Sequence, residues 1–291
     1  MQNNMKHDLF VTLVLIFLFL GAHIIGLFVV KNYIPSEQQL PLGIEKPQFN
    51  ERTSYIPITI ALIVTTIIAL ILIKFAAFRL WKLWFFLSIF FTLTVAFAAF
   101  IPEPIAIPLS LLLAVWKTFK PNVLIHNFTE LFVYGGLAAV FVPVLNLWSV
   151  VILLLIISVY DMVAVWKTKH MISMAKFQAK SRLFAGLFVP YKAKAIAAQP
   201  IPATKTKSQK KVYKEAILGG GDIAFSLLFS GVILKTFGFP QALLVSFVTA
   251  ISLFLLFLFA DKKKFYPAMP FVTVGCLLGY LLVRLILCTA T

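Results

Sequence analysis

The sequence is short of charge, and of negative charge in particular. Charged residues make up 12% of its 291 positions, against about 25% in an average soluble domain. Asp and Glu together number ten, whereas Lys and Arg number 26. Because 61% of the residues are hydrophobic, a water-soluble fold lacks the polar residues to cover its surface, and we expect a membrane domain instead.

Cysteine is scarce as well. The chain has two, Cys276 and Cys288, both in its last hydrophobic run. Their separation of 12 residues corresponds to about 18 Å along a helix, which is too long for a disulfide. No group of Cys and His residues has the spacing of a metal site, so we expect neither a metal nor another cofactor.

Hydrophobic runs of about 20 residues, the length of a helix that crosses a bilayer, recur along the chain. They predict an all-α, polytopic membrane protein with nine transmembrane helices. The fourth run gives the weakest signal, because it is short and carries Pro104 and Pro108. The nine runs are 9–30, 55–73, 83–101, 105–119, 125–143, 148–166, 216–234, 240–260 and 267–288.

The basic residues indicate the orientation. With a cytoplasmic N-terminus, 21 of the 26 Lys and Arg residues fall in cytoplasmic segments and four in outside loops, while Arg284 lies inside the last run. A missed helix would destroy this alternation. The positive-inside rule therefore favours nine helices in the cell membrane, with the N-terminus in the cytoplasm and the C-terminus outside.

Twelve of the basic residues lie between positions 167 and 214. A basic arm that binds nucleic acid is one interpretation. The other cytoplasmic segments show the same bias, so we expect contact with anionic lipid headgroups and no nucleic acid. This loop divides the chain into 1–166 with six helices, 167–214, and 215–291 with three helices, a six-plus-three arrangement. We expect its apolar part, 183–191, to reach the membrane surface.

Of the ten acidic residues, only Asp161 and Asp222 lie well inside predicted helices. A carboxylate there costs at least about 2.5–3.5 kcal/mol on insertion scales, which indicates a function. Asp161 precedes Lys167 by six residues and Asp222 follows Lys214 by eight, which is about 9 Å and about 12 Å of helix. On consecutive antiparallel helices, the two carboxylates should lie at nearly the same depth, near the cytoplasmic surface.

Two neighbouring carboxylates in a medium of low dielectric constant do not both ionise readily, so the pair shares one proton. The ionised carboxylate can take a proton from a water, and the protonated one can donate to the carbonyl oxygen of a peptide bond. Because the pair titrates as a unit, neither residue is assigned as acid or base. Paired intramembrane acids also serve proton- or cation-coupled transporters and channels, and position alone favours neither function.

The residues before Asp222 favour a protease. Leu218 is followed by Gly219, Gly220 and Gly221. Adjacent glycines loosen the start of a helix and let a second backbone approach closely, as hydrolysis of an unwound substrate helix requires. A helix-packing face, the alternative, spaces its glycines every fourth residue instead.

Two further segments lie where a protease site would need them. Tyr160 offers a hydroxyl group at the depth of Asp161, although an interfacial or core tyrosine is the plainer interpretation. The sequence Pro-Ala-Met-Pro at 267–270 opens the last run, and its prolines leave backbone groups free to pair with an extended substrate. Taken alone, this segment also fits an ordinary helix that begins with proline.

These motifs resemble the three marks of the presenilin and signal peptide peptidase family, which are Tyr-Asp, Gly-x-Gly-Asp and Pro-Ala-Leu. Here they are Tyr160-Asp161, Gly219-Gly220-Gly221-Asp222 and Pro267-Ala268-Met269. Met269 replaces the leucine, a mild change between flexible side chains of similar volume. The resemblance covers the whole chain. It implies that Asp161 and Asp222 are the catalytic dyad, and that the Pro-Ala-Met segment shapes the site and binds substrate.

The resemblance also implies an aspartic endopeptidase that hydrolyses peptide bonds within transmembrane helices. The predicted orientation matches the presenilins, because signal peptide peptidases invert it. The compact chain resembles microbial, archaeal homologues, which implies that no partner subunits are needed. Prepilin-type peptidases also carry Gly-x-Gly-Asp, but they lack a motif like Pro-Ala-Leu after it and fit less well.

Overall fold

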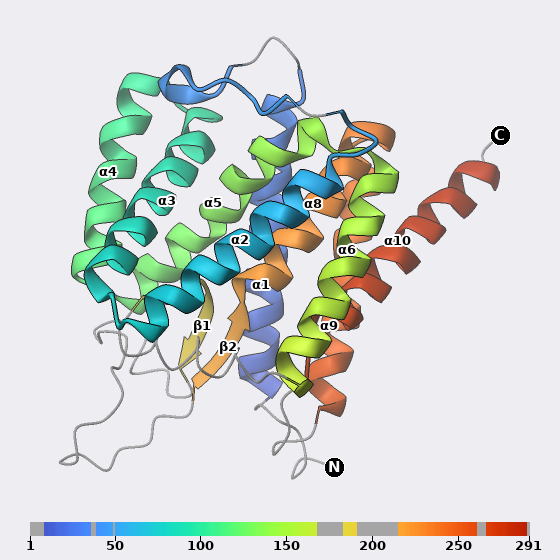
Figure 1. Ribbon diagram of the computed structural model, residues 1–291. Coiled ribbons are helices and arrows are strands. Elements are labelled where there is room, and N and C mark those ends of the chain that lie inside the picture. Colours follow the sequence, from blue (N-terminus) through green and yellow to red (C-terminus); the bar gives the residue numbers. More distant parts are fainter. Residues whose placement is uncertain are drawn as a thin grey trace.

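The structure, a computed structural model, describes residues 9–35, 39–48, 50–167, 183–190, 215–260 and 266–289. It confirms the all-α membrane fold, because within these ranges the chain forms nine α-helices with a two-stranded hairpin at one end of the bundle (Figure 1). The helices are α1 (Leu9–Tyr33), α2 (Tyr55–Lys74), α3 (Phe78–Ala98), α4 (Glu103–Phe119), α5 (Val123–Phe141), α6 (Leu147–Met162), α8 (Gly220–Phe237), α9 (Phe239–Phe259) and α10 (Met269–Thr289).

Eight of these nine described helices are long and apolar enough to cross a membrane. The other one, α4, has 17 residues and corresponds to the run with the weakest sequence signal. It lies beside α3 and also contacts α5 (Figure 1). Among the described residues, six helices come before the hairpin and three after it, as the six-plus-three arrangement predicts.

Local sequence explains where the central helices begin and end. The Asn122 side chain accepts a hydrogen bond from Leu124 N (2.9 Å) at the start of α5, and Asn146 accepts one from Ser149 N (2.8 Å) at the start of α6. Gly238 separates α8 from α9 with a φ of 107°, a conformation that glycine adopts without steric cost.

Helix α1 packs against α5, α8 and α9, and two glycines of α5 allow close approach to α1 and to α3. A Cβ atom at Gly135 would lie 2.9 Å from the Cα of Gly26 on α1. One at Gly136 would clash with the backbone carbonyl of Thr92 on α3. Both glycines are therefore used for packing within the chain.

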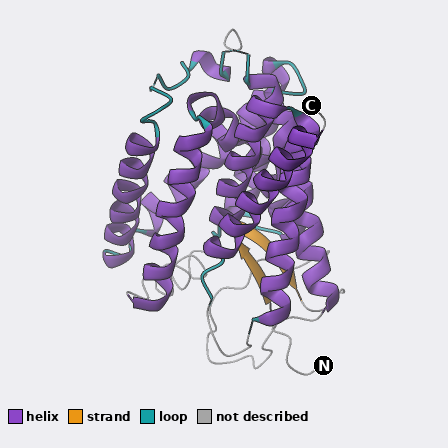
Figure 2. Ribbon diagram, turned by 90° about the vertical axis from the view of Figure 1, so that its right-hand side faces the viewer, coloured by secondary structure: helices purple, strands orange, loops and turns teal. Residues whose placement is uncertain are grey.

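The hairpin corrects the sequence prediction for the seventh run. A helix from residue 216 is wrong, because Glu215–Gly219 form strand β2, which pairs antiparallel with β1 (Gly186–Pro190). Helix α8 starts only at Gly220. The helical rise assumed between residues 214 and 222 therefore does not apply, since a strand advances about 3.3 Å per residue. Figure 1 places the hairpin at the end of the bundle where α8 begins, and Figure 2 shows the two strands from a second direction.

The side chains of the hairpin show why these residues form strands. In β2, Ala216 and Leu218 are buried whereas Ile217 is exposed, which is the alternation of a strand. In β1, Leu187 and Phe188 are buried, and the strand packs against α1 and α5. Helices cover the apolar side chains of these two residues, and the expectation that 183–191 reaches the membrane surface stays a prediction. Residues 168–182 and 191–214 of the predicted basic loop lie outside the described residues, so their contact with lipid headgroups stays a prediction.

Candidate active site

Asp161 lies in the last turn of α6, where the α-helix gives way to a π-helical turn over Val163–Lys167. Such turns are uncommon and occur often at functional sites. The Asp161 side chain is buried, with 7% of its surface exposed. Its Oδ2 accepts a hydrogen bond from the backbone N–H of Met269 at 3.1 Å, and the backbone of Ala268 also interacts with this carboxylate. Since the first N–H groups of a helix lack partners within it, the start of α10 is well suited to bind Asp161.

Asp222 is the third residue of α8, and Gly219 is the N-cap of that helix. Its side chain is partly exposed. A negative charge in the first turn is favoured by the helix dipole. Helix α6 packs against both α8 and α10, and the carboxylates of Asp222 and Asp161 interact electrostatically. The structure thus brings together the two acids that the sequence singled out, each at the end of its helix.

The three glycines before Asp222 differ in how much space a side chain would find at each position. A Cβ atom at Gly219 would lie 3.0 Å from Oδ2 of Asp222. One at Gly220 would lie 2.9 Å from the Tyr134 hydroxyl oxygen and 3.2 Å from the carbonyl oxygen of Ala185. At Gly221 the nearest atoms would be 3.9 Å away, an ordinary contact. Space is therefore tightest at Gly220, narrower than usual at Gly219 and ordinary at Gly221.

The Pro-Ala-Met segment lies where the resemblance implies. Pro267 and Met269 are buried, and α10 begins at Met269, two residues later than the predicted run. The proline pattern predicts that free backbone groups of this segment pair with substrate. The Met269 N–H instead binds Asp161 in this structure, which ties the segment directly to the aspartate pair.

Two other predicted site residues, Tyr160 and Leu218, contact helix α2 and the hydrophobic core, respectively. The Tyr160 side chain is 42% exposed, and its hydroxyl group lies 3.5 Å from Oγ1 of Thr66 on α2. Leu218 is buried in the hydrophobic core as part of β2. Leu218 therefore anchors the strand that leads to Asp222, while Tyr160 faces the neighbouring helix α2.

Sequence reasoning missed a buried polar cluster on α4 and α5, here called the α4–α5 polar cluster (Lys117, Glu130 and Tyr134). Lys117 was counted with the cytoplasmic charges, yet it is 1% exposed and forms an ion pair with Glu130. The Tyr134 hydroxyl donates to the second carboxylate oxygen of Glu130. A signal was present, because Glu130 lies inside a hydrophobic run, four residues from both His126 and Tyr134.

The same helix, α5, also holds strand β1 through side chains. His126 Nε2 lies 2.7 Å from the carbonyl oxygen of Gly186. Asn127 donates to the carbonyl oxygen of Phe188 at 2.7 Å and accepts from the N–H of Phe188 at 3.0 Å. Since β1 pairs with β2, these bonds help to fix the strand that leads into Asp222.

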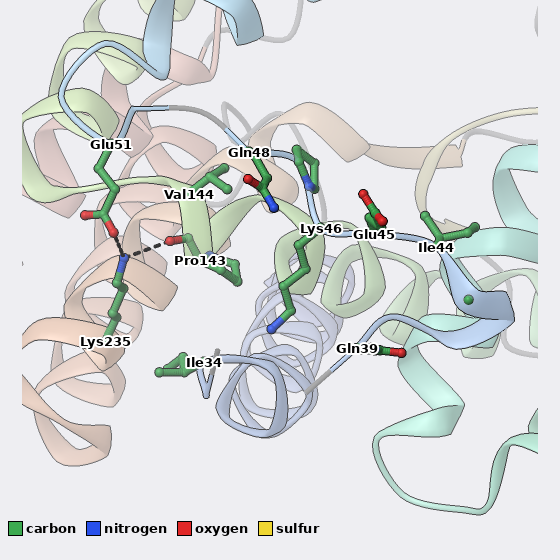
Figure 3. Close-up of a pocket in the computed structure, with 12 residues that line it drawn as sticks. Ile34, Gln39, Ile44, Glu45, Lys46, Gln48, Glu51, Pro143, Val144 and Lys235 are labelled. Atoms are coloured by element: carbon green, nitrogen blue, oxygen red, sulfur yellow. Dashed lines mark hydrogen bonds and ion pairs between the residues drawn. The ribbon is translucent and has the colours of Figure 1, made fainter. Parts of the chain in front are cut away.

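A cavity of about 600 Å³ lies at the opposite end of the bundle (Figure 3). Lys235, in the last turn of α8, donates to Glu51 Oε1 (2.9 Å) and to the carbonyl oxygen of Pro143 (2.8 Å) at its wall. Lys46 donates to two backbone carbonyls at the end of α1. Because Lys235 and Asp222 are about 20 Å apart along α8, this cavity is separate from the aspartate pair.

Comparison with known proteins identifies the family to which the chain belongs. A model of the family described as signal-peptide peptidase, presenilin aspartyl protease matches residues 14–289. The chain therefore belongs to this family of intramembrane aspartyl proteases, and it is an integral membrane protein. The family resemblance inferred from the motifs is confirmed, whereas an archaeal origin stays a prediction.

Two solved structures share the fold. Both are of a presenilin family intramembrane aspartate protease, in the C222 and P2 space groups, with TM-scores of 0.62 and 0.61. They are 18% identical to this chain, and the matches cover 94% of it and 99% and 97% of theirs. At this identity the likeness shows the fold alone. A comparison with curated proteins gives no match.

Proposed function

We propose that this chain is an intramembrane aspartyl endopeptidase with Asp161 and Asp222 as its catalytic dyad. The observation that carries the proposal is their placement: two carboxylates from different helices interact at adjoining ends of α6 and α8. Family membership supports the reaction class. A transporter or channel would also use buried acids, but neither the fold nor the family favours it.

The reaction needs a water between the two carboxylates, which share one proton. The ionised carboxylate takes a proton from this water while the oxygen of the water attacks the carbonyl carbon of the scissile bond. The protonated carboxylate donates to the carbonyl oxygen, which gives a tetrahedral diol. Breaking the C–N bond then passes a proton to the leaving amine and restores the shared proton. The bond between Asp161 and the Met269 N–H orients one carboxylate for these transfers.

A substrate helix must unwind before a peptide bond can reach the dyad, and strand β2 offers a partner for the unwound segment. The N–H and C=O groups of Phe188 bind Asn127, so they point away from β2. In an antiparallel pair, the residue opposite then also points its groups away from its partner. That residue is Ile217, and within the described part of the chain no third strand pairs with β2.

We therefore infer that an extended substrate segment adds to the free edge of β2, beside the exposed Ile217 and four to five residues before Asp222. The substrates are transmembrane helices of membrane proteins. With the predicted orientation, the cut falls near the cytoplasmic surface of the membrane. The chain carries both acids itself, so we expect activity without partner subunits.

The test uses the purified full chain in lipid vesicles with a transmembrane peptide substrate, and mass spectrometry to locate the cut. Asp161→Asn and Asp222→Asn should each lower kcat by at least about 10³-fold, since each removes one acid–base group of the pair. Glu51→Gln, at the far end of the bundle, is the matched control and should cleave normally. If either Asn variant cleaves within about tenfold of the unsubstituted rate, the dyad assignment is wrong. If the unsubstituted chain cuts nothing but conducts ions in an Asp-dependent way, the transporter takes its place.

A further inference from the structure

The α4–α5 polar cluster has no part in the reaction proposed above, yet it is buried within the helix bundle. Lys117 and Glu130 are each 1% exposed, and Tyr134 is 4% exposed. Replacing a buried ion pair with well-packed apolar residues is often neutral or stabilising. Stability alone therefore gives no reason for two charges at this position.

Glu130 connects the other two members of the cluster. One of its carboxylate oxygens binds the ammonium group of Lys117 on α4, and the other accepts from the hydroxyl group of Tyr134. The hydroxyl hydrogen of Tyr134 is thus committed to Glu130. With both oxygens of the carboxylate occupied, the tyrosine ring and its hydroxyl group are held in one orientation.

The hydroxyl group of Tyr134 lies against the turn that carries Asp222. A Cβ atom at Gly220, two residues before Asp222, would lie only 2.9 Å from the hydroxyl oxygen of Tyr134. The N–H of Gly220 also donates to the carbonyl oxygen of Ala185 at 3.2 Å. The first residue of α8 therefore lies close to both the tyrosine hydroxyl and the segment before β1.

We propose that Tyr134 is a positioning residue for Asp222, and that the Lys117–Glu130 pair keeps its hydroxyl group in place. The hydroxyl group fixes the first turn of α8 and so sets where the Asp222 carboxylate lies relative to Asp161. This role rests on the proposed function, because it matters only if the two carboxylates must share a water. Small errors in the position of a catalytic group lower kcat far more than they affect folding.

The first test compares two buried tyrosines. Tyr134→Phe keeps the ring and removes the hydroxyl group, and it should lower kcat about tenfold with KM changed less than about twofold. Tyr33→Phe is the matched control: its hydroxyl group donates to the carbonyl oxygen of Val95 (2.9 Å) on α3, away from the aspartates. Both variants should lose similar amounts of Tm, but only Tyr134→Phe should lose kcat. If both lose kcat equally, or if Tyr134→Phe keeps it, the positioning role is wrong.

The second test separates the hydrogen bond from the ion pair. Lys117→Met/Glu130→Gln removes both charges but keeps an oxygen that accepts from Tyr134. Lys117→Met/Glu130→Leu removes that acceptor as well. If the cluster only stabilises the fold, the two double variants should have the same kcat at equal folded fraction. The positioning role requires that the Gln variant retain most of kcat and the Leu variant lose about as much as Tyr134→Phe.

Failure of this inference is distinguishable from failure of the proposed function. Asp222→Asn must be inactive for the proposed function to hold, whatever the Tyr134 variants do. If Asp222→Asn is inactive and Tyr134→Phe is fully active, the dyad stands and the positioning role falls. If Asp222→Asn is active, both are wrong.

Discussion

Two Lys–Glu pairs lie at opposite ends of the bundle, and they differ in almost every respect. Lys117 and Glu130 join α4 to α5 near the hairpin, with side chains that are 1% and 2% exposed. Lys235 and Glu51 meet at 2.9 Å beside the far cavity, with side chains that are 25% and 51% exposed (Figure 3). The first pair adjoins the turn of Asp222, and the second closes the other end of α8.

The contrast shows what each pair contributes. An exposed ion pair is worth about 0–1 kcal/mol, because water screens it and ordering two long side chains costs entropy. A buried pair is costly to break, since the remaining charge stays buried without a partner. The far pair is therefore a weak link between the end of α8 and the turn before α2, whereas the near pair makes the surroundings of the site intolerant of change.

The largest expected effect is on stability at the near pair. Lys117→Met leaves the Glu130 carboxylate buried without its cation, and we expect a loss of about 3–5 kcal/mol in the free energy of unfolding. Chemical unfolding of the purified protein in detergent measures this loss. The double variant Lys117→Met/Glu130→Gln should recover most of it. A loss below about 1 kcal/mol for the single variant would mean that the near pair behaves like the far one.

A second effect concerns activity at the near end. Gly220→Ala places a methyl group against the Tyr134 hydroxyl, which is held by Glu130 and cannot move away freely. We expect kcat to fall about tenfold. Gly221→Ala, whose new methyl group meets only ordinary contacts at 3.9 Å, should cost much less. Equal losses in a cleavage assay of the two variants would show that helix flexibility, not the contact with Tyr134, matters.

The smallest effect is expected at the far pair. Lys235→Met removes the bond to Glu51 and the bond to the carbonyl oxygen of Pro143. The free energy of unfolding should fall by no more than about 1 kcal/mol, and kcat should stay unchanged. A tenfold loss of kcat would instead reveal coupling along α8 and end the distinction between the two pairs.

Much of the fold could be predicted because two signals agree: the length of the hydrophobic runs, and the unequal distribution of Lys and Arg between the loops on the two sides of the membrane. The predicted runs lie within two or three residues of most helices, and the weakest run corresponds to α4, the one described helix that is not among the eight candidate membrane spans. Asp161 and Asp222 stood out for a physical reason as well, since an isolated carboxylate inside an apolar run is costly. Their roles in catalysis stay proposals.

The errors fall where short segments decide the structure. The run at 216–219 is apolar and too short for its period to distinguish a strand from a helix, and its partner β1 lies about 30 residues earlier. The charge pattern places Lys117 among the cytoplasmic charges, whereas its partner, Glu130, comes from the next helix. Neither the strand pairing nor this ion pair is visible until the chain is folded.

Helix α8 carries Asp222 in its first turn and Lys235 in its last, with 18 residues in one continuous helix. An α-helix hardly stretches, so the distance between the two, about 20 Å, is fixed by the chain itself. The aspartate pair and the Lys235 cavity therefore keep a fixed separation along α8. Bilayers differ in thickness by a few Å. A substrate helix that binds at the Lys235 end should therefore be cut by the proposed dyad at a constant distance from that end, whatever the thickness of the lipid.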